Sequence, residues 1–308
     1  MATVTGDSEA KRFPSDDKVR VSQLVEAFEK ANIDSKDEAD SSDSEESEES
    51  QRLSTVTFLY ERLVDKSKSQ PVVFIGESDN RSMPIALAVL RGNLEGIWAT
   101  SRLPVEPWTF SGFEELLEKQ IAQAKINWEL KKPPMSDVDR GKATKPFNAF
   151  KEYLANGDGT RVENLLERFV EGADATDLRS SFDGLKPTNN IWFQCPWPHG
   201  NDGFYPDTLL KWFVRSAAEV QAPGDVLIIG LTTHTDYAHK YKLEGFMEYA
   251  TRCGYEHLVE DSDFIGQLLD LGYLHVGWRG ADIHWKLFNY HVTHVFKKKS
   301  YETKSAFT

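Results

Sequence analysis

The chain has 308 residues, 40% of them hydrophobic, with eight Trp and eighteen Phe. This composition is typical of a globular protein with a sizeable core. The formal net charge of −13 argues against a broad surface for binding nucleic acid. Only −5 of that charge falls after residue 52, which leaves room for a local basic groove.

Cysteine content and terminal sequence indicate the compartment. Cys195 and Cys253 are the two cysteines, and they form no CxxC metal pattern or disulfide framework. Residues 1–15 are too polar for a secretory signal, and the longest apolar runs are too short to cross a bilayer. We therefore expect an intracellular protein, cytoplasmic or nuclear and nucleolar, without a membrane contact and without a metal.

The N-terminal part is strongly acidic. Residues 34–50 hold nine acids, six Ser and one Lys, and such a segment buries too little apolar surface to offset its ordering entropy. We predict that 1–52 is an acidic, Ser-rich flexible tail with a short helix at 21–31, and that 301–308 is a second tail. The acidic tail either keeps the protein soluble or binds a protein partner.

From residue 53 the sequence alternates between strand and helix patterns. Strands are expected at 72–76, 96–101, within 161–178, at 190–195 and at 225–231. Helices are expected at 82–92, 112–130, 208–220 and 238–254, with an insertion at 131–160. In the first of these helices Ser82 suits the N-cap, Pro84 the first turn and Gly92 the C-terminal stop.

The last part of the chain has a different pattern. "FNYHVTHVFKKK", 288–299, alternates and is preceded by no crossover helix, so we expect an antiparallel strand paired with 255–262 or 274–278. Alternating strands and helices imply right-handed crossovers and a mostly parallel sheet. Residues 53–300 are therefore predicted to form one α/β domain, a Rossmann-like, doubly wound sheet of the class I methyltransferase type.

The first strand ends in a turn, "GESDN", at the edge of the sheet where such folds bind ligands. A dinucleotide site needs several glycines and this turn has only Gly76, while a Walker loop needs a G-K-S/T that is missing. S-adenosylmethionine carries no phosphate, and its ammonium and sulfonium groups favour carboxylates such as Glu77 and Asp79. The plain structural alternative is a strand-to-helix turn with a solvated acidic tip.

Four segments together resemble one family. "VVFIGESDNRSMPIALAVL" (72–90), "IWATSR" (97–102), "VEGADATDL" (170–178) and "IWFQCPWPHG" (191–200) are similar, in order and spacing, to segments of the Rossmann-like domain in eukaryotic large-subunit rRNA (uridine-N3) methyltransferases, the enzymes that act on 25S rRNA. The resemblance runs from about 70 to 297 and marks this chain as a divergent member. It implies an S-adenosylmethionine-dependent methyltransferase that takes part in rRNA processing, with RNA as a partner.

The resemblance also implies where the ligands sit. The cofactor side would comprise Gly76, Glu77, Ser78, Asp79, Ser101, Asp174 and Ala175. The catalytic, acceptor side would comprise Gln194, Trp197 and His199. Trp197 is suited to stack on a base, Gln194 to hydrogen-bond a pyrimidine or amide edge, and His199 to accept a proton from an imide nitrogen. Here too a rigid, proline-rich structural loop is the alternative.

The chain departs from the family at the donor loop and beyond it. Ser78 replaces the second glycine, Arg102 stands where an acid would hold the ribose, and Gln194 replaces an Asn. These changes favour a second hypothesis, in which the domain keeps the fold, has lost the donor site and works as a binding or scaffold module. Arg102 would also suit an anionic ligand in place of a ribose.

Other chemistries fit less well. His291 and His294 are three apart on an expected strand, so they should face opposite sides and cannot share a metal. "THTDYAH", 233–239, offers His234, Asp236 and His239, but no third His or Cys stands at ligand spacing. No G-x-S-x-G nucleophile elbow is present, which disfavours a hydrolase.

Overall fold

The computed structural model describes most of the α/β domain. The described residues are 58–65, 70–77, 81–102, 168–182, 189–198, 205–261, 263–271 and 290–300, with single positions at 115, 118, 119, 122, 273 and 275. The predictions for 1–52, 131–160 and 301–308 lie outside these residues. The expected helix at 112–130 is described at four positions only, and all four are helical.

Seven strands form one sheet in the order β3-β2-β1-β4-β5-β7-β6. Their bounds are Val72–Ile75 (β1), Ile97–Ser101 (β2), Phe169–Glu171 (β3), Asn190–Gln194 (β4), Val226–Thr232 (β5), Tyr255–Asp261 (β6) and His291–Lys298 (β7). Strands β1 to β5 pair in parallel, and β7 runs antiparallel to both of its neighbours. The predicted fold class is confirmed: this strand order with one reversed strand is the class I methyltransferase-type, Rossmann-like sheet.

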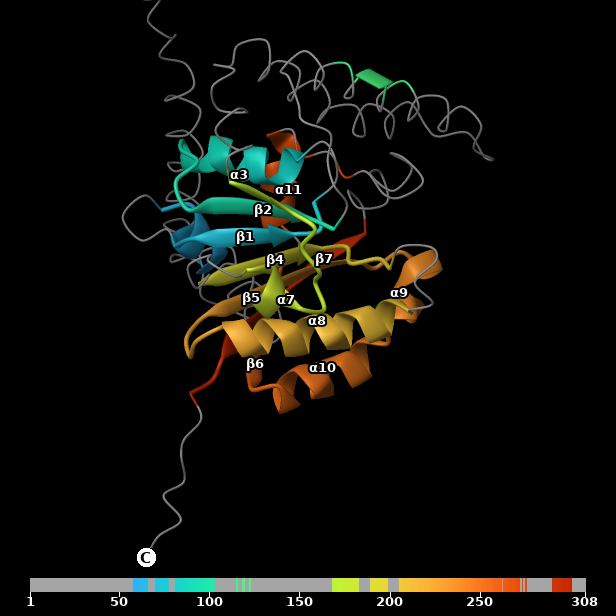
Figure 1. The fold of residues 1–308 in the computed structure, drawn as a ribbon. Helices are drawn as coiled ribbons and strands as arrows, with labels where there is room; N and C mark the ends of the chain where they lie inside the picture. Colours follow the sequence, from blue (N-terminus) through green and yellow to red (C-terminus); the bar gives the residue numbers. More distant parts are fainter. Residues whose placement is uncertain are drawn as a thin grey trace, which may run out of the picture. The chain divides into compact units, whose positions relative to one another are not determined.

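Helices cover both faces of the sheet. Figure 1 shows α3 (Ser82–Arg91) and α11 (Phe264–Asp270) on one face, and α8 (Pro206–Val220) and α10 (Leu243–Arg252) on the other. Two shorter helices, α7 (Leu178–Ser181) and α9 (Thr235–Tyr241), lie on the α8 side. None of the described helices is long and apolar enough to span a bilayer.

The side chains of each strand alternate between two apolar clusters. Phe74 and Val295 pack on the face covered by α3 and α11, whereas Val73 and Phe296 pack on the face covered by α8 and α10. His291 therefore shares a face with Val295, and His294 shares a face with Phe296. The prediction that these two histidines face opposite sides is confirmed.

Helix α3 begins one residue away from its predicted cap. Arg81, at φ 45°, is the N-cap residue and no side chain caps the helix, so the assignment of Ser82 to that role is wrong. Ser82 is instead fully buried as the first helical residue. The C-terminal stop is confirmed, because Gly92 adopts φ 74° and its N–H donates to the Val89 carbonyl.

The segment 238–254 was expected to be one helix, and the structure divides it into α9 and α10. Lys242 separates them with a left-handed φ of 46°, and its ammonium group lies 3.1 Å from Oδ2 of the largely buried Asp207. The apolar spacing runs through this break because both helices pack on the same cluster. An ion pair to α8 therefore accompanies the break between the two helices.

Candidate functional site

The carboxyl ends of the parallel strands meet at one edge of the sheet, as predicted. The Glu77 N–H donates to the Thr100 carbonyl over 2.8 Å, which joins the turn after β1 to the end of β2. The Ala173 N–H donates to Ser101 over 2.9 Å, and the Cys195 N–H donates to Gly230 over 2.8 Å. The turns after β1, β3 and β4 therefore lie along the same edge, where α/β sheets bind ligands.

Gly76 is required by its own backbone and by its neighbours. It adopts φ 67°, and its N–H donates to Thr100 Oγ1 over 3.2 Å. A Cβ built at this position would lie 3.0 Å from Cε2 of Phe193 on β4. A side chain would therefore strain the turn and also push into the neighbouring strand.

Glu77 has an unusual electrostatic environment. Burial raises the pKa of its carboxyl from 4.5 to about 8, and the nearby Arg81 guanidinium offsets this in part. At neutral pH the carboxyl is mostly protonated, and a cationic ligand placed beside it would favour the ionised form. Ser78 and Asp79, the other acid of this turn, lie outside the described residues.

Arg81 turns inward at the start of α3. It is 2% exposed, and its guanidinium carbon lies 3.7 Å from the centre of the Phe169 ring on β3. Ser101, at the end of β2, is also buried, while Arg102 is exposed. Arg81 is thus a cation whose charge acts on Glu77, and the sequence patterns did not single it out.

Asp174 closes the turn after β3. Its Oδ1 accepts hydrogen bonds from the Thr176 N–H at 2.8 Å and the Thr176 hydroxyl at 2.7 Å. Ala175 packs against the apolar cluster under α8. Because a carboxylate has about four acceptor positions, Asp174 can stabilise this turn and still accept a bond from a ligand.

Gln194, a predicted acceptor-side residue, is folded back onto the sheet. It is 8% exposed, and its Oε1 accepts a hydrogen bond from Trp192 Nε1 over 3.0 Å. Its amide lies over Gly230 of β5, where any Cβ would collide with it. The amide that was expected to meet the acceptor is therefore engaged by the protein itself.

Trp197 lies further along the same turn and is accessible. It is 39% exposed, its ring stands edge-on to Tyr241 at 6.4 Å between centres, and Lys240 Nζ lies 5.1 Å from the ring centre. An exposed indole beside an ammonium group suits a planar ligand with negative charge nearby. His199, two residues on, lies outside the described residues.

A group of buried and partly buried ionisable side chains at this edge was not predicted. The Tyr273 hydroxyl and His275 Nδ1 form a hydrogen bond of 2.7 Å. Burial raises the pKa of Cys195 to about 12 and lowers the pKa values of His275 and His291 to about 4 and about 3. Burial, and then the neighbouring Cys195 and Glu77, raise the pKa of Tyr273 well above its usual value, so these three side chains share one environment. Such clusters of shifted pKa values concentrate at functional sites.

One residue of this group, Cys195, and one residue near Glu77, Arg81, have strained backbones. Arg81 and Cys195 have φ values of 45° and 47°, a region that costs a residue with a side chain about 1–2 kcal/mol. Both follow a strand at the carboxyl edge, and such strain is concentrated at functional sites. No short sequence motif identifies Tyr273 or His275 as site residues. They come from a segment nearly 200 residues beyond Gly76.

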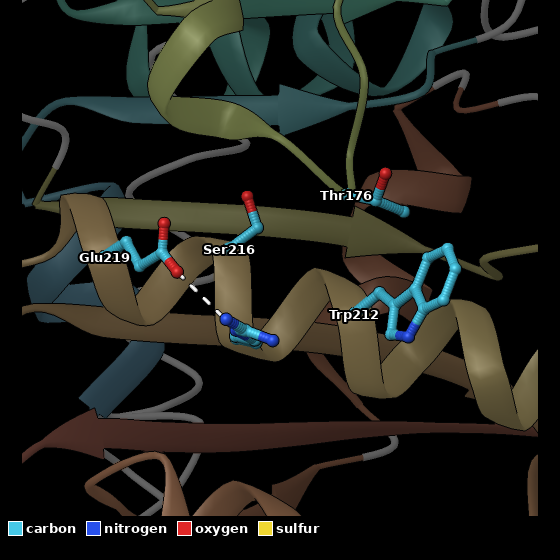
Figure 2. A pocket seen from close by; sticks show the side chains of 5 residues that line it. Thr176, Trp212, Ser216 and Glu219 are labelled. Atoms are coloured by element: carbon cyan, nitrogen blue, oxygen red, sulfur yellow. Dashed lines mark ion pairs between the residues drawn. The ribbon is translucent and has the colours of Figure 1, made fainter.

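A separate hollow of about 220 Å³ lies beside the turn after β3 (Figure 2). Thr176 and four residues of α8 line it, namely Trp212, Arg215, Ser216 and Glu219. Arg215 Nε lies 3.6 Å from Glu219 Oε1, one turn further along the same helix. The hollow contains none of the predicted site residues and is open and polar, so we do not assign the site to it.

Comparison with known proteins gives limited information. No protein-family model matches the chain, and no curated protein sequence matches it significantly. Solved structures with a similar arrangement include the Methanococcus jannaschii fibrillarin pre-rRNA processing protein (10% identity, 75% of this chain and 67% of that one, TM-score 0.36). Others are a methyltransferase from Pyrococcus furiosus (13%, 81% and 83%, 0.34) and the [4+2]-cyclase SpnF (13%, 80% and 80%, 0.35). Because these scores are low, the fold class rests on the strand order of this chain.

Proposed function

We propose that this protein is an S-adenosylmethionine-dependent methyltransferase that binds its cofactor at the carboxyl edge of β1 to β4. The observation that carries the proposal is Glu77, a partly buried carboxyl with a pKa of about 8 in the turn between β1 and α3. A cation relieves the cost of burying this carboxylate, and S-adenosylmethionine is a cation without phosphates. The strand order and the resemblance to uridine-N3 methyltransferases support the same assignment.

The donor side would use three turns. Gly76 allows the turn after β1 to pass close to the ligand, and Glu77 faces its positive charge. Asp174 and Ala175, after β3, would border the adenosine. Ser78, Asp79 and Ser101 complete the cofactor side that the resemblance implies.

The acceptor side would lie on the turn after β4. We propose an acceptor with a planar ring and an acidic N–H, of which the N3 position of uridine in rRNA is the family's example. Trp197 would stack on the ring and His199 would accept the proton as the new N–C bond forms and the S–C bond breaks. Gln194 would hold the turn to β5 through its contacts with Trp192 and Gly230.

Calorimetric titration of the full chain with S-adenosylmethionine tests the donor side. We expect saturable binding that weakens in Glu77→Gln, while Glu115→Gln, an exposed carboxylate paired with Lys119, leaves the affinity unchanged. Transfer of labelled methyl groups to total RNA tests the acceptor side, with His199→Ala as the inactive variant. Absence of heat at millimolar ligand would remove the enzyme assignment.

A second candidate function is supported by specific contacts. Gln194 is folded back onto β5, Arg81 already places a cation near Glu77, and Tyr273 shares its environment. These features fit a domain that kept the fold, lost the donor and serves as a binding or scaffold module. It predicts no S-adenosylmethionine binding and unaltered biological function in His199→Ala, so the same two experiments separate it from the enzyme.

A further inference from the structure

The two outermost strands at the end of the sheet far from β1, namely β7 and β6, carry three potential ligand side chains. Strand β6 lies at the end of the sheet and pairs antiparallel with β7. The register shifts between His257 and Val259, so that His257 lies opposite Phe296 while Glu260 lies opposite His294. The shift leaves Leu258 as an extra, exposed residue of a β-bulge.

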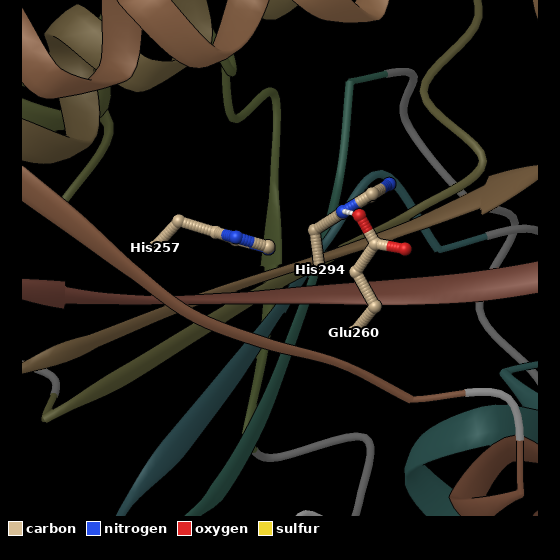
Figure 3. A group of neighbouring side chains, drawn as sticks. All are labelled: His257, Glu260 and His294. Atoms are coloured by element: carbon tan, nitrogen blue, oxygen red, sulfur yellow. Dashed lines mark ion pairs between the residues drawn. The ribbon is translucent and has the colours of Figure 1, made fainter. Parts of the chain in front are cut away.

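The bulge decides which side chains share a face. Residues three apart on a regular strand point to opposite faces, so His257 and Glu260 would ordinarily be separated. The extra residue restores them to one face, the face of His294 and Phe296. Figure 3 shows His257, Glu260 and His294 gathered there, with the Glu260 carboxylate turned toward the His294 ring.

The distances suit a metal ion. One ligand atom from each of the three side chains lies within 4.8 Å of the others. His294 Nδ1 and Glu260 Oε1 are 3.4 Å apart. Bonds of about 2.1 Å at tetrahedral angles place neighbouring ligand atoms about 3.4 Å apart. The third ligand, His257, is exposed and can close the remaining distance by a small side-chain rotation.

His294 provides a second, independent observation that indicates a bound ion. The residue is fully buried, and neither ring nitrogen has a hydrogen-bond partner among the described residues. Buried polar atoms are nearly always satisfied, and leaving one unpaired is costly.

We propose that His257, Glu260 and His294 bind one divalent transition-metal ion, with Zn²⁺ the best fit. Two imidazoles and a carboxylate match the ligands that Zn²⁺ accepts, whereas Ca²⁺ and Mg²⁺ require oxygen ligands. Because His257 and Glu260 are exposed, water can complete the tetrahedron. The bound ion ties edge strand β6 to β7 on the face opposite the apolar cluster that contains Tyr273.

The experiment uses the full chain, freed of any affinity tag and of metal. Titration with Zn²⁺ by calorimetry and with Co²⁺ by absorption should each give one equivalent, with the spectrum of a four-coordinate site for Co²⁺. His257→Ala and Glu260→Gln should each weaken Zn²⁺ binding at least about tenfold, because even loss of a group behind the ligands costs about 10–100-fold. Both positions are exposed, so these variants should fold.

His239→Ala is the matched control. His239 is an exposed histidine on α9 whose Nδ1 lies 3.0 Å from the Thr235 carbonyl, outside the three-residue group, and its replacement should leave Zn²⁺ affinity unchanged. Absence of a stoichiometric site, or equal affinity in the wild type and in both ligand variants, would overturn the proposal. Neither result depends on whether the protein binds S-adenosylmethionine.

Discussion

Replacement of Glu77 by Gln should make the stability of the protein less dependent on pH. In the folded chain burial raises the Glu77 pKa to about 8, whereas in the unfolded chain the carboxyl has its usual value of 4.5. Between these values the folded state keeps a proton that the unfolded state has lost. The free energy of unfolding therefore falls as pH rises from 4.5 to about 8, and this contribution is constant outside that interval.

The size of the effect follows from the two pKa values. Each pKa unit corresponds to about 1.36 kcal/mol, so the interval sets an upper limit of about 5 kcal/mol. The Glu77 side chain is only partly buried, and water reaching it reduces the cost of ionisation. We therefore expect the free energy of unfolding of the wild type to fall by about 2–4 kcal/mol relative to that of Glu77→Gln across this interval.

Urea denaturation of both proteins at about pH 5, 6.5 and 8 measures the difference, in which contributions from all other groups cancel. Glu115→Gln is the control, because Glu115 is exposed and a hydrogen bond from Lys119 lowers its pKa. The free energy of unfolding of that variant should not increase relative to that of the wild type as pH rises. Parallel pH profiles for Glu77→Gln and the wild type would show that the carboxyl is solvated, and would refute the reasoning.

Three further substitutions test the packing of the fold, two at the carboxyl edge of the sheet and one, Arg91→Met, at the opposite edge, just before β1 and β2. Gly76→Ala should lower the free energy of unfolding by about 1–3 kcal/mol in urea denaturation, because φ is 67° and the new Cβ meets Phe193; an unchanged midpoint would show that the turn can rearrange. Gly230→Ala should lower the free energy of unfolding by about 1–3 kcal/mol, because the new Cβ displaces the Gln194 amide. In the double variant with Gln194→Ala the loss should be at least about 0.5 kcal/mol smaller than the sum of the two single losses. Additive losses would contradict the contact. Arg91→Met should cost about 2–4 kcal/mol, since the buried guanidinium donates to three backbone carbonyls, and a thermal midpoint equal to the wild type's would be inconsistent with these bonds.

The sheet was predictable because its strands are short apolar runs between turn residues. Val72–Ile75, Ile97–Ser101 and Asn190–Gln194 fall inside their predicted ranges, and the alternation at 288–299 identified the reversed strand β7. Periodicity reports burial, and burial is what a strand at the centre of a sheet experiences on both faces.

Features that depend on one backbone angle could not be predicted. The break at Lys242 and the left-handed Arg81 occur at residues that rarely adopt positive φ, so no propensity signals them. At Lys242 the side chain also contacts a distant part of the chain, the carboxylate of Asp207 on another helix.

The location of the candidate site, at the carboxyl edge of the sheet, was predicted from the sequence. Only some of its residues were predicted. Parallel topology placed Gly76, Glu77 and Asp174 together, because carboxyl ends of parallel strands must meet. Tyr273 and His275 join them from a distant segment without a recognisable motif. The inward rotation of Gln194 depends on the absence of a side chain at Gly230, a pairing that only the register of β4 and β5 reveals.

Proton release on cofactor binding tests most directly whether Glu77 receives the positive charge of S-adenosylmethionine. Calorimetric titrations at about pH 7 in two buffers of different ionisation enthalpy give the number of protons released. Since the Glu77 pKa is about 8, the wild type should release up to about 0.9 proton more than Glu77→Gln as the bound cation ionises the carboxyl. Equal proton release by the two proteins, or no binding by the wild type, would contradict the proposed donor site.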